Sequence, residues 1–150
     1  MATLGRAIAI AAQAHQEQRD KAGAPYILHP LRMMAQLRSE PEMIVAVLHD
    51  LVEDTPWTPE QLRAEGFSEE VLTAIDCLTR RDDESYEAFI ERAAGNPLAR
   101  RIKLADLEDN MDLRRIAEVT DKDLERLRKY HRARQVLLAV SEYEPAKGDL

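Results

Sequence analysis

The stretch MIVAVLHDLVED, residues 43–54, joins an apolar run to a group of ionisable side chains. The apolar residues are followed directly by His49, Asp50, Glu53 and Asp54. Ionised carboxylates are costly to remove from water unless a cation meets them. The stretch therefore predicts a buried helix whose end lies either at a bound cation or at the solvent-exposed surface.

The composition of the 150-residue chain favours helices over sheets. Hydrophobic residues make up 45% of the chain and charged residues 33%, as in a globular protein, whereas aromatic residues make up only 5%. Ala, Leu, Arg and Glu are abundant, and no segment shows the alternating pattern of a strand. We expect an all-α fold, a single compact bundle of about seven to eight helices.

Capping residues and prolines predict where these helices begin. Ser39 with Glu42, and Thr58 with Gln61, have the spacing of capping boxes. Pro30 is expected to be the first residue of a helix. Five expected helices cover residues 3–18, 40–54, 59–65, 85–94 and 97–118, and three more begin at 29–30, 69 and 121. Residues 142–150 are expected to form a flexible tail.

Charge and cysteine content indicate the class of protein. The formal net charge of -7 argues against a nucleic-acid partner. The lone cysteine, Cys77, excludes an internal disulfide and fits a reducing cytoplasm. No apolar segment approaches the roughly 20 residues of a membrane span. We expect one cytoplasmic domain over residues 1–150 without a membrane partner, and the sequence leaves open whether it forms a homo-oligomer.

Helical spacing groups the ionisable residues after the apolar run. His49 and Glu53 are four residues apart, as are Asp50 and Asp54, so each pair shares one side of a helix. Imidazole and carboxylate together form a ligand set for Mn²⁺, Fe²⁺ or Zn²⁺. The alternative is the solvated end of a helix, and a His-Asp dipeptide does not decide between them.

Two further residues favour the metal. His29 lies among apolar residues at a predicted helix start, and Asp106 lies between apolar neighbours in the segment IKLADLEDN. A buried aspartate needs a partner. Taken singly, His29 could cap a helix and Asp106 could pair with Lys103 or Arg101. Together they supply the imidazole and the acid that a four-ligand site needs beyond His49 and Asp50.

The ordered set of His29, His49-Asp50 and Asp106 resembles the pattern of the HD metal-dependent phosphohydrolases. The segments DKAGAPYILHP, LHDLVEDT and KLADLEDNM are similar to motifs of the Rel/Spo-type alarmone hydrolases, which cleave (p)ppGpp. The resemblance covers residues 15–112. It implies an HD-domain helical bundle and removal of the 3′-pyrophosphate from a (p)ppGpp-like nucleotide, the chemistry of the stringent response.

The resemblance also implies a role for each matching residue. His29, His49, Asp50 and Asp106 would hold Mn²⁺ or another divalent metal. The acidic pair Glu53 and Asp54 would position and deprotonate the attacking water. Lys21 would reach the phosphates, and Asn110 would lie near the sugar of the nucleotide. A metal that lowers the pKa of water and a carboxylate that takes the proton agree with this division.

Two substrate-side positions depart from the alarmone hydrolases. Asp20 stands where those enzymes usually carry an arginine that stacks on the base, and Asp112-Leu113 stands in place of Arg-Thr. We therefore expect weak discrimination between guanine and adenine. The alternative substrates are an adenosine alarmone, a phosphorylated nicotinamide dinucleotide or a nucleoside monophosphate, and the non-enzymatic alternative is a domain that binds a nucleotide without turnover.

Three other features have two interpretations each. Tyr26 could line the substrate pocket or simply pack beside Pro25. His15 is interpreted as a structural residue rather than a ligand. The basic run 126–134 could meet a phosphate, although a solvated helix face is the preferred interpretation, and His131 within it is expected to pack or cap.

Overall fold

The computed structural model describes residues 1–142, which form nine α-helices, one short 3₁₀ helix and no β-strand. The helices are α1 (Leu4–Ala14), α2 (Leu28–Ala35), α3 (Glu40–Leu48), α4 (Leu51–Asp54), α5 (Pro59–Ala64), α6 (Glu69–Cys77), α7 (Tyr86–Ala94), α8 (Pro97–Asn110), the 3₁₀ helix η1 (Leu113–Arg115) and α9 (Asp121–Glu142). The all-α prediction is confirmed. None of the described helices is long and apolar enough to cross a bilayer.

Local capping chemistry begins most of these helices where the sequence predicts it. Ser39 and Thr58 each form a full capping box, with Glu42 and Gln61 as the partners. The side chain of Asn96 accepts a hydrogen bond from the backbone of Ala99 and thereby caps α8. These side chains satisfy the amide groups that the first turn of a helix leaves unpaired.

Four predicted boundaries are wrong. The segment 40–54 is not one helix, because the chain breaks at His49 and Asp50 between α3 and α4. The segment 97–118 ends as a helix at Asn110, because Asp112 is extended and its side chain caps a new turn at Arg114. Helix α1 ends at Ala14 rather than at residue 18, and α2 begins two residues before Pro30. Most of the predicted tail, residues 143–150, lies outside the described residues.

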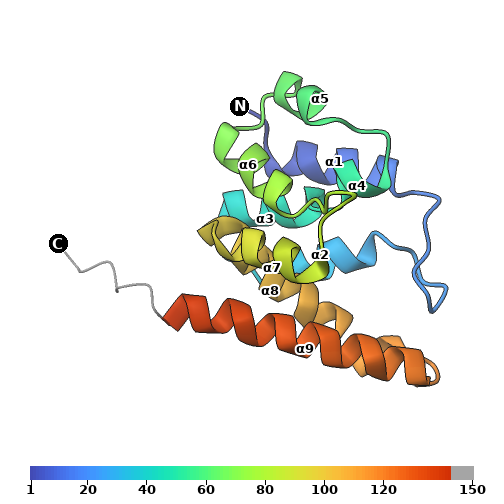
Figure 1. The fold of residues 1–150 in the computed structure, drawn as a ribbon. Coiled ribbons are helices and arrows are strands. Elements are labelled where there is room, and N and C mark those ends of the chain that lie inside the picture. Colours follow the sequence, from blue (N-terminus) through green and yellow to red (C-terminus); the bar gives the residue numbers. More distant parts are fainter. Residues whose placement is uncertain (143–150) are drawn as a thin grey trace.

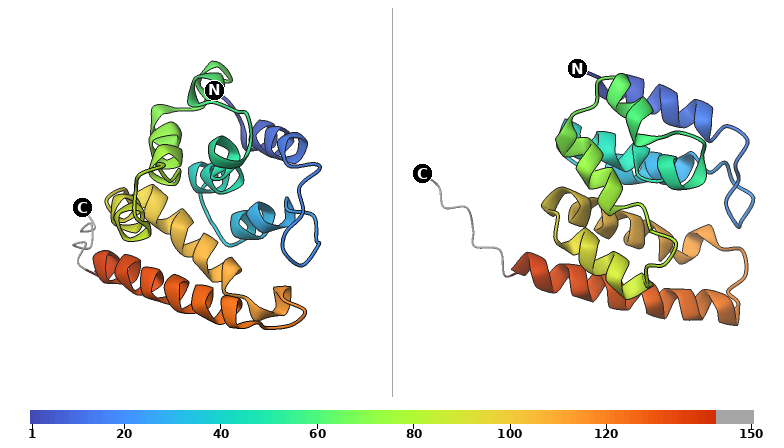
Figure 2. Two further views of the ribbon diagram at one scale, coloured as in Figure 1. Left: turned by 45° about the vertical axis from the view of Figure 1, so that its right-hand side comes forward. Right: turned by 45° about the horizontal axis from the view of Figure 1, so that its top comes forward.

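The bundle is arranged around α3 and α8. Helix α2 packs against both of them, α1 packs against α3, and α9 packs against α7 and α8. Figures 1 and 2 show α9 along one side of the molecule, with α1 and α5 at the other. The longer connection between α1 and α2, residues 15–27, projects beside the ends of these helices (Figure 1). This arrangement brings the polar ends of α2, α3 and α8 together.

Apolar burial fixes the same arrangement. Residues 44–48 of α3 are all buried, together with Met33 of α2 and Ile102 of α8. A second cluster joins α7, α8 and α9 through Phe89, Leu107 and Leu137. The buried charged or imidazole side chains among the described residues are His15, His29, His49, Arg100 and Asp106. Two of the three buried histidines, and the buried aspartate, therefore lie at positions predicted to hold a metal.

Candidate metal centre and nucleotide pocket

Three predicted ligands from separate helices meet inside the protein. His29 lies on α2, His49 directly follows α3, and Asp106 lies on α8. One potential ligand atom from each lies within 4.8 Å of the others, and all three residues are buried. The apolar surfaces of α2, α3 and α8 pack together, and this packing carries the three side chains to one point.

His49 presents an unused lone pair to this point. Its Nδ1 lies 2.6 Å from the backbone oxygen of Ala46, which can only accept, so Nδ1 carries the proton. In a neutral ring Nε2 then bears a lone pair, and this buried atom makes no hydrogen bond with any residue of the described part of the chain. It faces Asp50 Oδ1 at 3.1 Å and Asp106 Oδ1 at 3.7 Å. A lone pair that faces carboxylate oxygens is repelled unless a cation lies between them.

His29 is oriented by a carboxylate that the sequence did not single out. Its Nδ1 lies 2.6 Å from Asp109 Oδ2, and its Nε2 lies 3.0 Å from Asp106 Oδ1. Metal-binding histidines usually donate the second ring N–H to such an acceptor, which fixes the ring and its tautomer. Burial opposes the charged imidazole, but Asp106 and Asp109 raise the pKa of His29 above its ordinary value.

Asp106 makes different contacts through its two oxygens. Oδ2 accepts a hydrogen bond of 2.6 Å from Lys103 Nζ, and Oδ1 accepts one of 2.9 Å from Asn110 Nδ2. Burial alone would raise the pKa of Asp106, but Lys103 and the two histidines hold it well below its usual range. The expected Lys103 ion pair is therefore present, and it leaves Oδ1 facing the two histidines.

Asp50 lies beside the three-residue group, at the 3.1 Å distance from His49 given above. Burial raises the pKa of Asp50 well above its usual range, and the charges of Asp106 and Asp54 raise it further. The negative charges of these carboxylates repel one another, and they surround an imidazole nitrogen that has no hydrogen bond to the described residues. A divalent cation at this point would relieve the repulsion and bind the nitrogen. The donor set of nitrogen and oxygen atoms suits a borderline metal such as Mn²⁺, Fe²⁺ or Zn²⁺.

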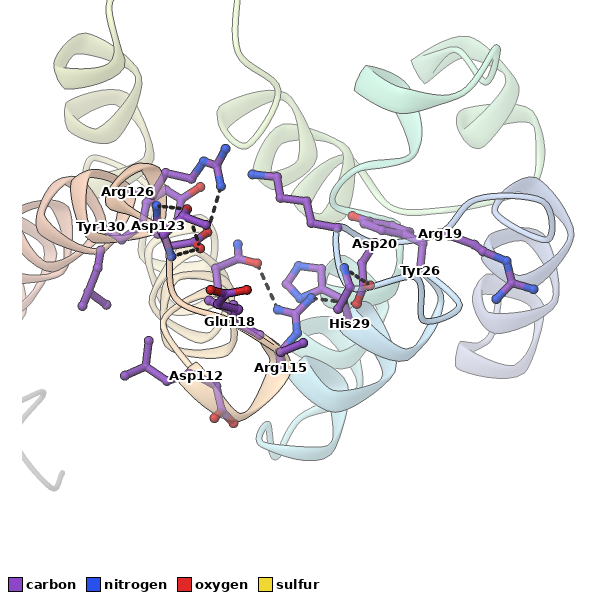
Figure 3. Close-up of a pocket in the computed structure, with 18 of the residues that line it drawn as sticks. Arg19, Asp20, Tyr26, His29, Asp112, Arg115, Glu118, Asp123, Arg126 and Tyr130 are labelled. Carbon is purple, nitrogen blue, oxygen red and sulfur yellow. Dashed lines mark hydrogen bonds and ion pairs between the residues drawn. The ribbon is translucent and has the colours of Figure 1, made fainter.

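A cavity of about 720 Å³ opens onto His29 and Asp50. Glu53 and Asp54 of α4 line it, and Glu53 Oε1 accepts a hydrogen bond of 3.2 Å from the backbone of Arg80. Burial raises the pKa of Glu53. Figure 3 shows that the cavity lies between the 15–27 connection and α9, which brings Arg126 and Tyr130 to the opposite wall. The cavity is large enough for a small-molecule ligand.

All three predicted substrate contacts line this cavity, namely Lys21, Tyr26 and Asn110. Lys21 is exposed, whereas the ring of Tyr26 packs against those of His15 and His29, with centroids 4.9 and 5.8 Å apart. Asn110 bonds Asp106, as given above, and its amide oxygen accepts a hydrogen bond from Arg115. Tyr26 therefore both lines the cavity and packs.

Asp20 lines the cavity but also has a structural role. Its Oδ1 accepts hydrogen bonds from the backbone amides of Ala22 and Ala24, at 3.0 and 2.9 Å, and closes the turn that contains Gly23. Its Oδ2 lies 3.5 Å from Arg115 Nη2. Arg19, by contrast, points away from His29 in Figure 3.

The remaining histidines have no direct place among the metal-ligating atoms. His15 is buried, and its Nδ1 lies 2.8 Å from Gln18 Oε1, so the structural interpretation agrees with its contacts. His131 is exposed on α9, so the expectation that it packs is wrong. Of the basic run 126–134, Arg126 reaches the cavity and forms an ion pair with Asp123 at 3.3 Å.

Asp109 and Arg115 are the contacts that sequence reasoning missed. Asp109 lies one turn after Asp106 on α8, and that spacing is the signal that could have found it. Arg115 lies beyond the end of α8, in a segment predicted to be helical, so nothing in its spacing indicated an inward direction.

Comparison with known proteins agrees with this geometry. The sequence profile of the HD domain family matches residues 7–142. The chain belongs to the HD domain family. This HD domain is 36% identical over 118 residues, 71% of its length, to the guanosine-3′,5′-bis(diphosphate) 3′-pyrophosphohydrolase of Aquifex aeolicus. It is 38% identical over 117 residues, 68% of its length, to the protein of that name from Haemophilus influenzae.

The HD domain spans 17% of the length of each of these two relatives. A solved structure matches a larger part of this chain. That protein is described as a metazoan ortholog of SpoT that hydrolyzes ppGpp and plays a role in starvation responses. The match has a TM-score of 0.75 and 26% sequence identity, and it covers 92% of this chain and 86% of the other. The HD fold is therefore shared over nearly the whole domain.

Proposed function

We propose that this HD domain is a metal-dependent nucleotide pyrophosphohydrolase that removes the 3′-pyrophosphate from (p)ppGpp-like alarmones. The observation that carries the proposal is the junction of three features in one cavity. The buried cluster of His29, His49 and Asp106 adjoins the acidic residues Glu53 and Asp54, and the cationic Lys21 lines the same cavity. A metal ion, a general base and a cationic contact to the phosphates are the parts that metal-assisted phosphate hydrolysis uses.

His29, His49, Asp50 and Asp106 would hold the metal, and Mn²⁺ is the ion that we propose. When bound, a divalent metal supplies a Lewis acid and lowers the pKa of water. Glu53 and Asp54 would orient the attacking water and accept its proton. Lys21 would hold the phosphates, and Tyr26 and Asn110 would contact the nucleoside side of the substrate.

The second candidate function keeps the metal and changes the nucleotide. It is favoured by Asp20, which is held in the cavity wall by two backbone amides and by Arg115. A carboxylate offers a base neither the cation–π contact nor the stacking that an arginine offers. An adenosine alarmone, a phosphorylated nicotinamide dinucleotide or a nucleoside monophosphate would then be the substrate. A domain that binds without turnover has no use for Glu53.

We further propose a cytoplasmic protein with a small-molecule substrate and without nucleic-acid or membrane partners. The formal net charge of -7 opposes binding to polyanions. Light scattering would measure whether the protein forms a homo-oligomer.

A nucleotide panel tests the function. The Mn²⁺-loaded protein is incubated with the guanosine and adenosine 3′-pyrophosphates, the phosphorylated dinucleotide and a monophosphate, and products are separated by anion-exchange chromatography. Release of pyrophosphate from a 3′-pyrophosphate, absent after chelation and in Glu53→Gln, is the expected result. Turnover of the adenosine compound, the dinucleotide or the monophosphate without turnover of the guanosine compound would transfer the assignment to the second candidate, and no turnover of any member would contradict both.

A further inference from the structure

Arg115 contacts both residues that orient the buried ligands His29 and Asp106. Its Nη1 donates to Asp109 Oδ2 at 2.9 Å, to the backbone oxygen of Asp109 at 3.0 Å and to Asn110 Oδ1 at 3.2 Å. Asp109 and Asn110 are consecutive residues at the end of α8, and one nitrogen therefore fixes them relative to each other.

Each of these two residues also binds a different candidate ligand. Asp109 Oδ2, the oxygen that Arg115 binds, also lies 2.6 Å from His29 Nδ1. Asn110 Nδ2 donates to Asp106 Oδ1 at 2.9 Å. A ring nitrogen held by a carboxylate, and a carboxylate oxygen held by an amide, have their directions set by those partners. Arg115 is therefore connected to each of the two ligands, His29 and Asp106, through one intervening residue.

The bonds of the guanidinium are made by its terminal nitrogens rather than by Nε. Arg115 Nε is buried and makes no hydrogen bond with the described residues. Nη1 faces Asp109 and Asn110, and Nη2 faces Asp20. Figure 3 shows the guanidinium of Arg115 directed towards His29 rather than towards solvent.

The fourth contact of Arg115 joins it to the 15–27 connection, which also lines the cavity. Its Nη2 lies 3.5 Å from Asp20 Oδ2, on the connection that carries Lys21. One planar side chain thus spans the end of α8 and the loop before α2. Lysine could not make this set of contacts, because an ammonium is a point charge without a planar fork of donors.

We propose that Arg115 is a positioning residue that holds the His29 and Asp106 ligands in metal-binding geometry, acting through Asp109 and Asn110. This rests on the proposed metal site and adds a residue outside the three recognised motifs. Arg32 also binds Asp109, through Oδ1 at 2.8 Å and Oδ2 at 3.1 Å, but makes no contact with Asn110. Arg115 is the side chain that holds both partners.

The test is a double-mutant cycle on Mn²⁺ affinity, measured by isothermal titration calorimetry. We expect Arg115→Met to raise the Kd for Mn²⁺ roughly 10- to 100-fold, the usual effect of losing a residue that orients a ligand. Asp109→Asn should act similarly, and the double variant should fall short of the product of the two single effects. The Mn²⁺ electron paramagnetic resonance spectrum should change in the single variants, because ligand geometry changes.

Arg114→Met is the matched control, because the exposed Arg114 bonds only Asp112 among the described residues. Its Kd for Mn²⁺ should equal that of the unmodified protein. If Arg115→Met does not fold, as judged by circular dichroism, Arg115→Lys replaces it and should show a severalfold weaker Kd.

An unchanged Kd in Arg115→Met, or in Arg115→Lys where that variant replaces it, would overturn the positioning role. So would full multiplicativity in the cycle, because the two residues would then act independently. If the unmodified protein binds no divalent metal, it is the proposed metal site that fails, and the two failures are thereby distinguished.

Discussion

At the scale of single residues, Glu53 differs from the buried ligands by its position at the cavity wall. It is exposed, lies outside the group of His29, His49 and Asp106, and accepts a hydrogen bond from the backbone of Arg80. We predict that Glu53→Gln lowers kcat roughly 10²- to 10⁴-fold, the cost of losing a positioned base, while the bound Mn²⁺ measured by mass spectrometry is unchanged.

The pH dependence of the same enzyme adds a second measurement for Glu53. Although Glu53 is exposed, the surrounding protein partly desolvates its carboxylate and so raises its pKa. A base acts only when ionised, so kcat should fall as the pH decreases through that raised pKa. The loss should begin at a higher pH than the ordinary glutamate pKa of about 4.3 would give. Asp106→Asn serves as the comparison, because it should lose metal. Equal metal loss in Glu53→Gln would make Glu53 a ligand instead.

Asp20 is the residue whose structural role changes the expected effect of substitution. Asp20→Arg would remove the acceptor of two backbone amides and place a second guanidinium beside Arg115. We predict that the free energy of unfolding falls by about 1–2 kcal/mol, as for the loss of a capping side chain, in addition to like-charge repulsion. Asp20→Asn keeps an acceptor oxygen, and urea titration should find it within about 0.5 kcal/mol of the unmodified protein. Equal stability of both variants would contradict the role of Asp20 in closing the turn.

The chemistry of the site could be predicted from residue types more easily than its supporting contacts. His29, His49 and Asp106 were identifiable because ionisable side chains inside apolar helices need a partner. Asp109 follows Leu107 and Glu108, and an acid near a helix end is usually solvated. Its contacts with His29, 80 positions away in sequence, depend on the packing of α2 on α8, which no local pattern contains.

At the scale of helices, side-chain caps made most starts predictable, while the ends of α1, α3 and α8 were missed. Ser39 and Thr58 each accept the amide hydrogen bond that the sequence predicts. The break at His49 and Asp50 interrupts a continuous apolar and acidic pattern, so periodicity alone extends the helix through it. Its consequence is that the His49 ring bonds the backbone oxygen of Ala46 and turns Nε2 towards Asp106.

An ion pair that is sensitive to pH joins α7 to the segment that precedes it. Arg92 binds the carboxylate of Glu84 through two nitrogens at 2.8 Å and the backbone oxygens of Asp76 and Thr79 at 2.7 Å, which ties α7 to the end of α6. The hydrogen bonds from Arg92 lower the pKa of Glu84 to about 2. Because this folded-state pKa lies below the unfolded one, the stabilisation is present above about pH 4.3 and is lost as the pH falls towards 2.

We therefore predict that Glu84→Gln lowers the thermal midpoint at pH 7 and that the difference from the unmodified protein shrinks below about pH 4. Calorimetry at pH 7, 5, 4 and 3 would measure it. Glu87→Gln, on the exposed side of α7, provides the control. A midpoint difference that stays constant with pH would show that Glu84 acts through packing and not through its charge.

At the scale of the whole molecule, the candidate ligands join helices that are far apart in sequence. His29 and Asp106 are 77 residues apart, and with His49 they connect α2, the end of α3 and α8 at one buried point. A ligand that binds only the folded protein stabilises it by the free energy of binding at the concentration used. A metal at this point would therefore stabilise the bundle as a whole rather than one helix.

We predict that chelation lowers the thermal midpoint of the Mn²⁺-loaded protein. At a free Mn²⁺ concentration 100 times the Kd, binding contributes about 2.7 kcal/mol, which corresponds to a shift of roughly 5–11 °C for a domain of this size. Scanning calorimetry with and without chelator would measure the shift. Glu53→Gln should retain it in full, because Glu53 lies outside the buried cluster, whereas Asp106→Asn should lose it. If Asp106→Asn still shows the full shift, the metal binds elsewhere, among the 28 acidic residues or at the exposed His131, and the buried cluster does not hold it.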